Sequence, residues 1–476
     1  MPYSFMSRLL SKMLAFGVLA LLVVLLVAAT LVDGIVGQGF AGDNIYSSLL
    51  FVALWGLLAL SALVYIFKSP VRRVPASLFL HLSLVVILVG AFVTYLTGER
   101  GSLFLRKEAA PSSMFVKSDG ALVAFPFRVV LEDCRVLYGE DGAPLDNVAG
   151  LSVLYAGGKD EARLSMNRVY DRDGYRFYIS EVTDDAVSLL VSHDPWGVPI
   201  TYSGYLLTVA GFLFLFMARG TQMAALRRWI TVRQEVSSCK TSFVRNSVLL
   251  AMALLLLGYI TYQGWCRWND TGVFPVSNGA EAMMFIAWCS LLPVPALLRR
   301  NGALASGVLC FSVVCVVAAL LSGVAVPGAV PPVLRTPLLP LHVAAIVSSY
   351  ALIAFLAVNS LVALCAYRFK HNYEQLERAA VQGRMVLYFA TFMLLVGIFL
   401  GAVWANISWG RYWGWDPKEV WALITLIVCS FGFHTRSLPF MARPLVFHCF
   451  CLVAFCVALF TYLGVNFLLG GLHSYA

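Results

Sequence analysis

The stretch WGRYWGWDPKEVWALITLIVCSFGFH, residues 409–434, joins an aromatic cluster to the start of an apolar helix. Asp416 is suited to cap that helix, Pro417 to fill its first position, and Glu419 follows the cap by three residues. The stretch carries four tryptophans: Trp409, Trp413, Trp415 and Trp421. They lie just before the helix and on its first turn, where one interpretation is an aromatic belt at a membrane surface. A Gly-spaced cluster that ends in a helix cap also fits a platform for a flat ligand.

The composition around this stretch predicts a polytopic membrane protein. Of 476 residues, 60% are hydrophobic and 12% are charged, and the mean hydropathy is +0.82. The net charge of +9 comes from Lys and Arg in alternate short loops. That distribution follows the positive-inside rule and indicates no nucleic-acid partner. No Walker-type phosphate loop occurs, so we expect any ATP-driven step to lie on another protein.

Eleven segments are apolar over about 20 residues, the length that crosses a bilayer. They lie near 13–32, 46–67, 77–97, 200–218, 247–264, 281–298, 303–325, 341–364, 385–405, 420–435 and 444–467. With the N-terminus in the cytoplasm, every basic loop falls inside and the C-terminus falls outside. The first segment has a long apolar run and no convincing small-residue cleavage site, so we expect a retained helix rather than a signal peptide.

Residues 98–199 form the only sizeable polar segment, on the predicted outer face. Alternating runs at Ala121–Leu131, Leu151–Tyr155 and Tyr175–Val182 are broken by Gly and Asp, and predict strands. The predicted fold is therefore a polytopic α-helical membrane protein with about eleven transmembrane helices and a small extracytoplasmic β domain.

The cysteines form no dithiol redox motif. No Cys-x-x-Cys occurs, and most of the eleven cysteines fall in apolar spans, where a cysteine is usually a small hydrophobe. Cys134 and Cys266 both fall on the outer side, and the sequence leaves open whether they pair.

The pattern WGxxWxWDPKExWALIT resembles the tryptophan-rich WWD signature of the haem-handling superfamily of cytochrome c biogenesis, and most of all the CcsA proteins of System II. Three helices, a β domain containing MNRVYDRDGYRFYIS and SHDPWGVPITYSGY, and a fourth helix resemble the ResB/CcsB family. Their order is that of fused CcsBA-type proteins. The System I protein CcmF shares the tryptophan motif, but the ResB-like half argues against it. The outer domain is shorter than in typical CcsB proteins, so the docking site of a protein substrate stays open.

The resemblance implies three parts. Residues 1–218 are a ResB/CcsB-like half with four transmembrane helices and the β domain at about 98–199. Residues 219–245 are a basic cytoplasmic linker. Residues 246–476 are a CcsA-like half with seven transmembrane helices and the WWD loop at 406–420.

Four of the seven histidines match the haem ligands of the family. His342 opens the eighth span at its outer end and His473 lies in the outer tail, which matches the outer pair. His81 lies near the cytoplasmic end of the third span and His434 ends the tenth, which matches the transmembrane pair, one from each half. An ionisable residue within a span is a functional candidate by default. The alternatives are polar helix-end residues, or histidines satisfied by a neighbouring hydroxyl or carbonyl.

The other three histidines receive structural or solvated roles. His448 lies in the eleventh span with no matching family position, and we interpret it as structural. We expect His193 to fix a turn of the outer domain and His371 to be solvated in a basic inner loop.

The resemblance implies a route for haem b, the transported substrate, from His81 and His434 to His342 and His473. Trp409, Trp413 and Trp415 would cover it there, and the catalytic set is His342, His473 and Asp416. Three cations, Arg411, Lys418 and Arg335, pair with the haem propionates or are ordinary interfacial cations.

The implied enzyme is a holocytochrome c synthase of the cytochrome c haem lyase type in the cytoplasmic membrane. It adds the thiols of an apocytochrome c Cys-x-x-Cys-His segment to the haem vinyl groups. Because the chain lacks a dithiol motif, a thioredoxin-like partner is expected to keep those thiols reduced. Two alternatives stay open: a haem transporter or chaperone without synthase activity, and a quinone- or proton-handling respiratory subunit.

Overall fold

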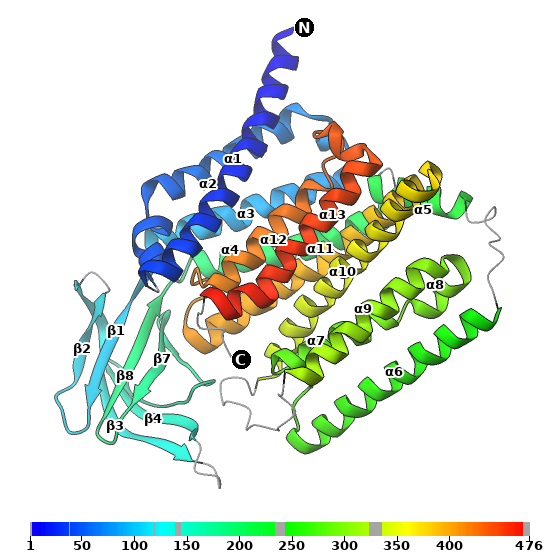
Figure 1. The fold of residues 1–476 in the computed structure, drawn as a ribbon. Helices are drawn as coiled ribbons and strands as arrows, with labels where there is room; N and C mark the ends of the chain where they lie inside the picture. Colours follow the sequence, from blue (N-terminus) through cyan, green and yellow to red (C-terminus); the bar gives the residue numbers. More distant parts are fainter. Residues whose placement is uncertain are drawn as a thin grey trace.

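The computed structural model describes residues 2–37, 39–117, 120–138, 144–219, 221–233, 243–322 and 336–469. It consists of a helical bundle with a β domain at one end (Figure 1). Its helices are α1 Pro2–Val36, α2 Leu49–Lys68, α3 Pro75–Thr97, α4 Gly197–Met217, α5 Gln222–Arg233, α6 Phe243–Thr271, α7 Gly279–Leu291, α8 Val294–Arg300, α9 Gly302–Leu321, α10 Leu338–Lys370, α11 Tyr373–Trp409, α12 Pro417–Phe431 and α13 Pro444–Leu459. Short helical segments are η1 Gly42–Tyr46, η2 Pro70–Arg73, η5 Pro439–Ala442 and η6 Phe460–Leu469.

Ten helical segments within the described residues are long and apolar enough to cross a membrane, which confirms the polytopic helical class. The predicted span near 420–435 is not among them. It is α12, which has 15 residues and a length of about 22 Å, short of the roughly 30 Å of a bilayer core. Pro417 and the turn at Gly432 set its two ends, so the apolar run in the sequence is longer than the helix.

The β domain contains the strands β1 Glu99–Arg106, β2 Ser112–Lys117, β3 Leu122–Tyr138, β4 Pro144–Tyr155, β5 Gly158–Leu164, β6 Tyr170–Arg172, β7 Tyr175–Val182 and β8 Ala186–His193. They form one antiparallel sheet in the order β5-β4-β3-β2-β1-β8-β7-β6. Alternate residues of β1 and β3 are buried, as expected for a sheet with one apolar face. Cys134 lies in that core, and both it and Cys266 are free thiols.

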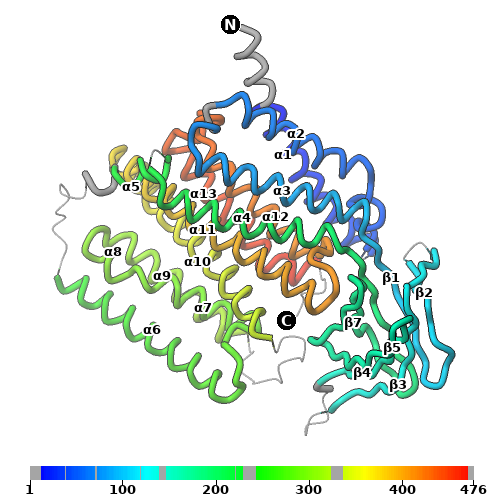
Figure 2. The backbone as a smooth tube through the Cα atoms, turned by 180° about the vertical axis from the view of Figure 1, so that it is seen from behind, coloured from blue at the N-terminus to red at the C-terminus, as the bar shows by residue number. Residues whose placement is uncertain are grey.

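The β domain is joined to the bundle by neighbouring strands. β1 follows α3 directly and pairs along its whole length with β8, which leads into α4. The end of α3 at Thr97 is therefore the end of the bundle that faces the β domain. Figure 2 shows the domain beside the ends of α3 and α4 from the opposite side.

The helices that follow the N-terminal half do not form a separate bundle. α12 lies between α1 and α11, while α6 to α9 form the side farthest from α1 (Figures 1 and 2). The buried indole of Trp421 on α12 donates to Thr30 on α1 at 3.1 Å. Val420 and Ile424 share a buried cluster with Leu22 and other residues of α1. The two halves therefore share one hydrophobic core at α12.

Candidate functional site: a capped aromatic loop and two histidine positions

The loop before α12 is shaped by the predicted helix cap. The Asp416 carboxylate accepts the backbone N–H of Lys418 at 3.0 Å, and Glu419 accepts those of Gly414 at 2.8 Å and Asp416 at 3.3 Å. The capping box predicted from the sequence is thus present. Trp415 adopts a φ of +57°, a conformation that costs a non-glycine residue about 1 kcal/mol or more. The cap holds this strained residue in place.

The four tryptophans of the motif face different neighbours. Trp415 stacks on Tyr46 of η1, with ring centres 4.5 Å apart, and Trp421 is buried against α1. Trp409 packs edge to face on Trp404, with ring centres 4.7 Å apart. Trp415 therefore fastens the loop and Trp421 fastens α12 to the N-terminal half, and Trp409 packs on its own helix.

Trp413 differs from the other three. Its ring is half-buried and meets Trp415 edge to face at 5.6 Å. Its indole N–H is buried and has no hydrogen-bond partner among the described residues. A buried donor without an acceptor is costly, which points to a ligand atom that accepts at this position.

The β domain contacts the end of α11, where the loop starts. The Tyr178 hydroxyl of β7 donates to the Asn406 carbonyl at 3.0 Å, and burial raises the pKa of the Tyr178 phenol, which keeps it protonated. Gly410 has a φ of +72°, and a Cβ there would lie 2.3 Å from the Tyr178 ring. Only glycine fits this contact, because both the backbone angle and the neighbouring ring exclude a side chain.

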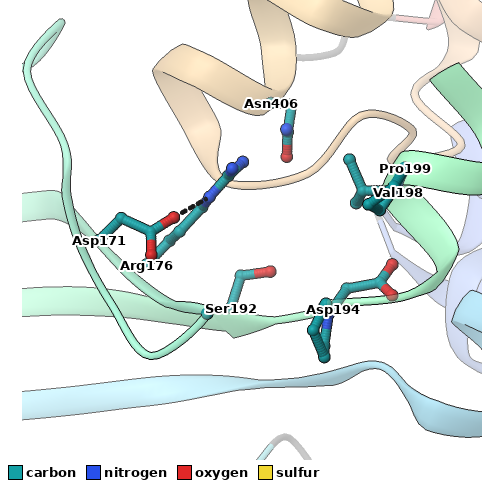
Figure 3. A pocket seen from close by; sticks show the side chains of 9 residues that line it. Asp171, Arg176, Ser192, Asp194, Val198, Pro199 and Asn406 are labelled. Atoms are coloured by element: carbon teal, nitrogen blue, oxygen red, sulfur yellow. Dashed lines mark hydrogen bonds and ion pairs between the residues drawn. The ribbon is translucent and has the colours of Figure 1, made fainter.

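A second contact ties the loop to α3 and to the segment between β8 and α4. The Tyr412 hydroxyl donates to Thr94 Oγ1 at 3.0 Å, and the Thr94 hydroxyl donates to Asp194 at 2.6 Å. Asp194 also lines a cavity of about 110 Å³ with Arg176, Ser192 and Asn406 (Figure 3). The loop, the β domain and α3 therefore form one hydrogen-bonded unit at this end of the bundle.

His81 and His434 meet at the opposite end of the bundle. Their rings are 6.1 Å apart between centres and nearly perpendicular, at 88°. His81 Nδ1 donates to the Ser77 carbonyl at 2.6 Å and His434 Nδ1 to the Ser430 carbonyl at 2.8 Å. In this tautomer the Nε2 atom of each ring carries a lone pair, as metal ligation requires. Phe16 of α1 packs edge to face on the His434 ring at 5.2 Å.

His342 lies near the start of α10, at the end of the bundle that faces the β domain. Its Nδ1 donates to the Gly397 carbonyl of α11 at 2.7 Å. A Cβ on Gly401 would lie 2.5 Å from its Cε1 atom, so the ring rests in a space that glycine leaves open. Its predicted partner His473 and the predicted cation Arg335 lie outside the described residues.

Comparison with known proteins identifies the family. The model of the cytochrome C assembly protein family matches residues 276–473, and that of the ResB-like family matches residues 63–190. The chain is 33% identical over 240 residues to the cytochrome c biogenesis protein CcsA of Guillardia theta, which covers 44% of this chain and 79% of that protein. With the CcsA of Parasynechococcus marenigrum it is 34% identical over 280 residues, or 50% of this chain and 88% of that protein. The chain belongs to the CcsA family of cytochrome c biogenesis proteins.

The ResB-like match precedes the CcsA-like one, which confirms the fused order predicted from the sequence. The chain is also 33% identical over 235 residues to the protein NrfI of Wolinella succinogenes, which covers 48% of this chain. It spans a quarter of the length of NrfI. The family places this membrane protein in cytochrome c assembly.

The two cations of the CcsA-like loop have different surroundings. The Arg411 guanidinium folds back over the loop, since a Cβ on Gly414 would lie 2.8 Å from its Cζ atom. Lys418 is half-buried on the first turn of α12. Arg411 lies on the loop that carries Trp413, and Lys418 lies on the helix that follows this loop. Their pairing with haem propionates remains a prediction.

The remaining histidines have neighbours that suit supporting roles. Both ring nitrogens of buried His448 are hydrogen-bonded, to Ser360 Oγ at 2.9 Å and the Leu376 carbonyl at 3.0 Å. His193 stacks on Tyr175 with ring centres 4.1 Å apart. His371 is exposed and ends α10 with a φ of +51°.

Replacing Asp416 by alanine is expected to lower the yield of mature cytochrome more than it lowers stability. Loss of the cap costs about 1 kcal/mol, which the shared core tolerates, but it frees the strained turn at Trp415. Asp416→Asn retains a capping oxygen and is the matched control. Thermal unfolding and cytochrome yield are the measurements. Equal yields from the alanine variant and the wild type would show that the cap has no part in the reaction.

Proposed function

We propose that this protein carries haem b across the cytoplasmic membrane and joins its vinyl groups to the Cys-x-x-Cys-His cysteines of apocytochrome c. In this proposal residues 1–218 and 246–476 each supply one histidine to the first haem site, and residues 219–245 link them on the cytoplasmic side. The β domain and the Trp loop then lie outside.

The pairing of His81 with His434 is the observation that carries the proposal. A metal–imidazole bond of roughly 2 Å on each side, with about 1 Å from each nitrogen to its ring centre, requires ring centres about 6 Å apart. The observed separation is 6.1 Å. No group of three or more metal-binding side chains gathers within the described residues. A lone pair of imidazoles suits a metal that brings its own in-plane ligands, as haem iron does.

The second site would hold haem where it reacts. His342 is fixed by its bond to Gly397, and Trp413 offers an unused N–H that suits a haem propionate. His473 is the proposed second ligand, and Trp409, Trp415, Arg411 and Lys418 shape the surrounding loop. From His81 to Thr94, which accepts a hydrogen bond from Tyr412 of the loop, α3 rises about 20 Å, so the first site and the loop lie at different levels of the bundle.

The reaction needs little chemistry from the protein side chains. Each cysteine S–H adds across one vinyl C=C bond, so that a C–S and a C–H bond form while the S–H and the π bond break. The step is redox-neutral and requires no oxidant, only thiols that a thioredoxin-like partner keeps reduced. His342, His473 and the capped loop at Asp416 would position the vinyl edge, which is the main source of rate in such a site. One axial histidine must then give way to the histidine of the substrate.

Coexpression with an apocytochrome c, in a host that lacks its own maturation system, tests this proposal. We expect covalent cytochrome from the wild type, and haem bound to His342→Gly without covalent product. Haem-loaded protein without any cytochrome product would support a transporter or chaperone instead. Purified protein that lacks haem but contains quinone would support a respiratory subunit.

A further inference from the structure

Three polar side chains form a chain of contacts that reaches the turn carrying His434, at the end of the bundle away from the β domain. The Lys12 ammonium of α1 lies over the Tyr65 ring of α2, 5.6 Å from its centre. The Tyr65 hydroxyl lies 3.4 Å from Ser437 Oγ, three residues beyond His434. We call Lys12, Tyr65 and Ser437 the polar mouth.

A second contact places the polar mouth beside the histidine pair. Phe16, whose ring meets His434 at 5.2 Å, is one helical turn after Lys12 on α1. Residues four apart share a helix face, with about 6 Å between them. Two chains of contacts therefore run from Lys12 to the turn at His434. One passes through the neighbouring Phe16, and the other through Tyr65 and Ser437.

The turn itself is held from its other side. Gln222 of α5 donates to Thr435 Oγ1 at 2.9 Å, and the Tyr388 hydroxyl of α11 donates to Gln222 at 3.3 Å. The turn from His434 to Ser437 is thus fixed between α2 and α5. The groups of the polar mouth keep a defined place relative to the imidazoles.

The polar mouth has the charge of an anion site. Lys12 is half-buried at the first residue of a membrane-crossing segment, and no carboxylate lies within ion-pair distance of it among the described residues. The nearby hydroxyls of Tyr65 and Ser437 supply further donors. A cation with adjacent hydroxyl donors suits a carboxylate.

We infer that the polar mouth binds a propionate carboxylate of the haem held between His81 and His434. The inference rests on the proposed function, because it requires haem at that pair. Propionates and vinyl groups project from opposite edges of the porphyrin. An anchored propionate therefore turns the vinyl edge toward the β domain, and the haem leaves this site with its reactive edge first.

Haem and its propionate dimethyl ester are the probes, titrated into purified, haem-free full-length protein in detergent. We expect wild type to bind haem at least tenfold more tightly than the ester, because the ester cannot form the charged contact. Lys12→Met should bind haem about as weakly as wild type binds the ester, and should no longer distinguish the two. Tyr65→Phe should show a smaller loss of discrimination. Lys370→Met, an exposed lysine at the end of α10, is the control and should discriminate like wild type.

The absorption spectrum separates failure of this inference from failure of the proposed function. Lys12→Met should retain the low-spin signal of haem bound by the His81–His434 pair, whereas His81→Gly should lose that signal. The inference is overturned if Lys12→Met discriminates as wild type does, or if wild type binds both probes equally while its bis-histidine spectrum is intact. If wild type binds neither probe, the proposed function fails and the inference fails with it.

Discussion

Replacing His434 with glycine is expected to abolish haem retention at the proposed first haem site, and His81→Gly is expected to do the same. Each substitution removes one of the two proposed axial ligands, whose ring centres are 6.1 Å apart. Loss of a supporting group alone costs metal sites 10- to 100-fold, so loss of a ligand should lower bound haem by more than about tenfold. The measurement is the haem content and absorption spectrum of the purified variants. Added imidazole should restore both, because glycine leaves space for the free ring.

His371→Gly is the matched control for this prediction. His371 is exposed and has a φ of +51°, where glycine is favoured, so this variant should fold normally and keep its haem. Wild-type haem content in both His81→Gly and His434→Gly would show that these rings do not hold the iron.

Replacing Gly401 with alanine is expected to lower the yield of mature cytochrome by 10- to 100-fold. The haem at the proposed His81–His434 site should stay in place. The added methyl group would lie 2.5 Å from the His342 ring, which must rotate or move. That shift breaks the 2.7 Å bond from His342 to the Gly397 carbonyl. Displacement of a positioning group by about 1 Å costs on the order of 100-fold in rate. Cytochrome yield and the spectrum of the retained haem are the two measurements.

Gly258→Ala is the control, because a Cβ there meets nothing within 4 Å. In mid-helix it should be neutral or slightly stabilising, by roughly 0.5–1 kcal/mol. Equal cytochrome yields from Gly401→Ala and Gly258→Ala would mean that the His342 ring has no part in the proposed second haem site.

Local features of the chain were predictable from the sequence. The cap at Asp416 and Glu419 depends on residues within one turn, and the spans depend on continuous apolar runs. The β domain was predictable because apolar and polar residues alternate along its strands. The length of α12 was not predicted correctly. Hydropathy alone does not show that the helix starts at Pro417 and stops before Gly432, inside the longer apolar run.

Contacts between distant segments were not predictable. The sequence of the GDNIY segment does not indicate that Tyr46 stacks on Trp415. Trp404 lies in an apolar run, so its contact with Trp409 was not predicted either. Tyr178 and Gly410 meet only because the β domain folds back onto the end of α11. The sequence placed His81 and His434 as a pair through family resemblance, and their separation and tautomer came from the structure.

Electron paramagnetic resonance of the purified ferric protein is the sharpest test of haem ligation by His81 and His434, since it reports both axial ligands and the angle between their planes. The planes of the His81 and His434 rings are 88° apart, so we expect a low-spin signal of the strongly anisotropic type that perpendicular imidazoles give. That signal should vanish in His434→Gly and return with imidazole. A low-spin signal that is unchanged in His81→Gly and His434→Gly, or a high-spin signal alone in every variant, would show that this pair does not ligate the haem iron.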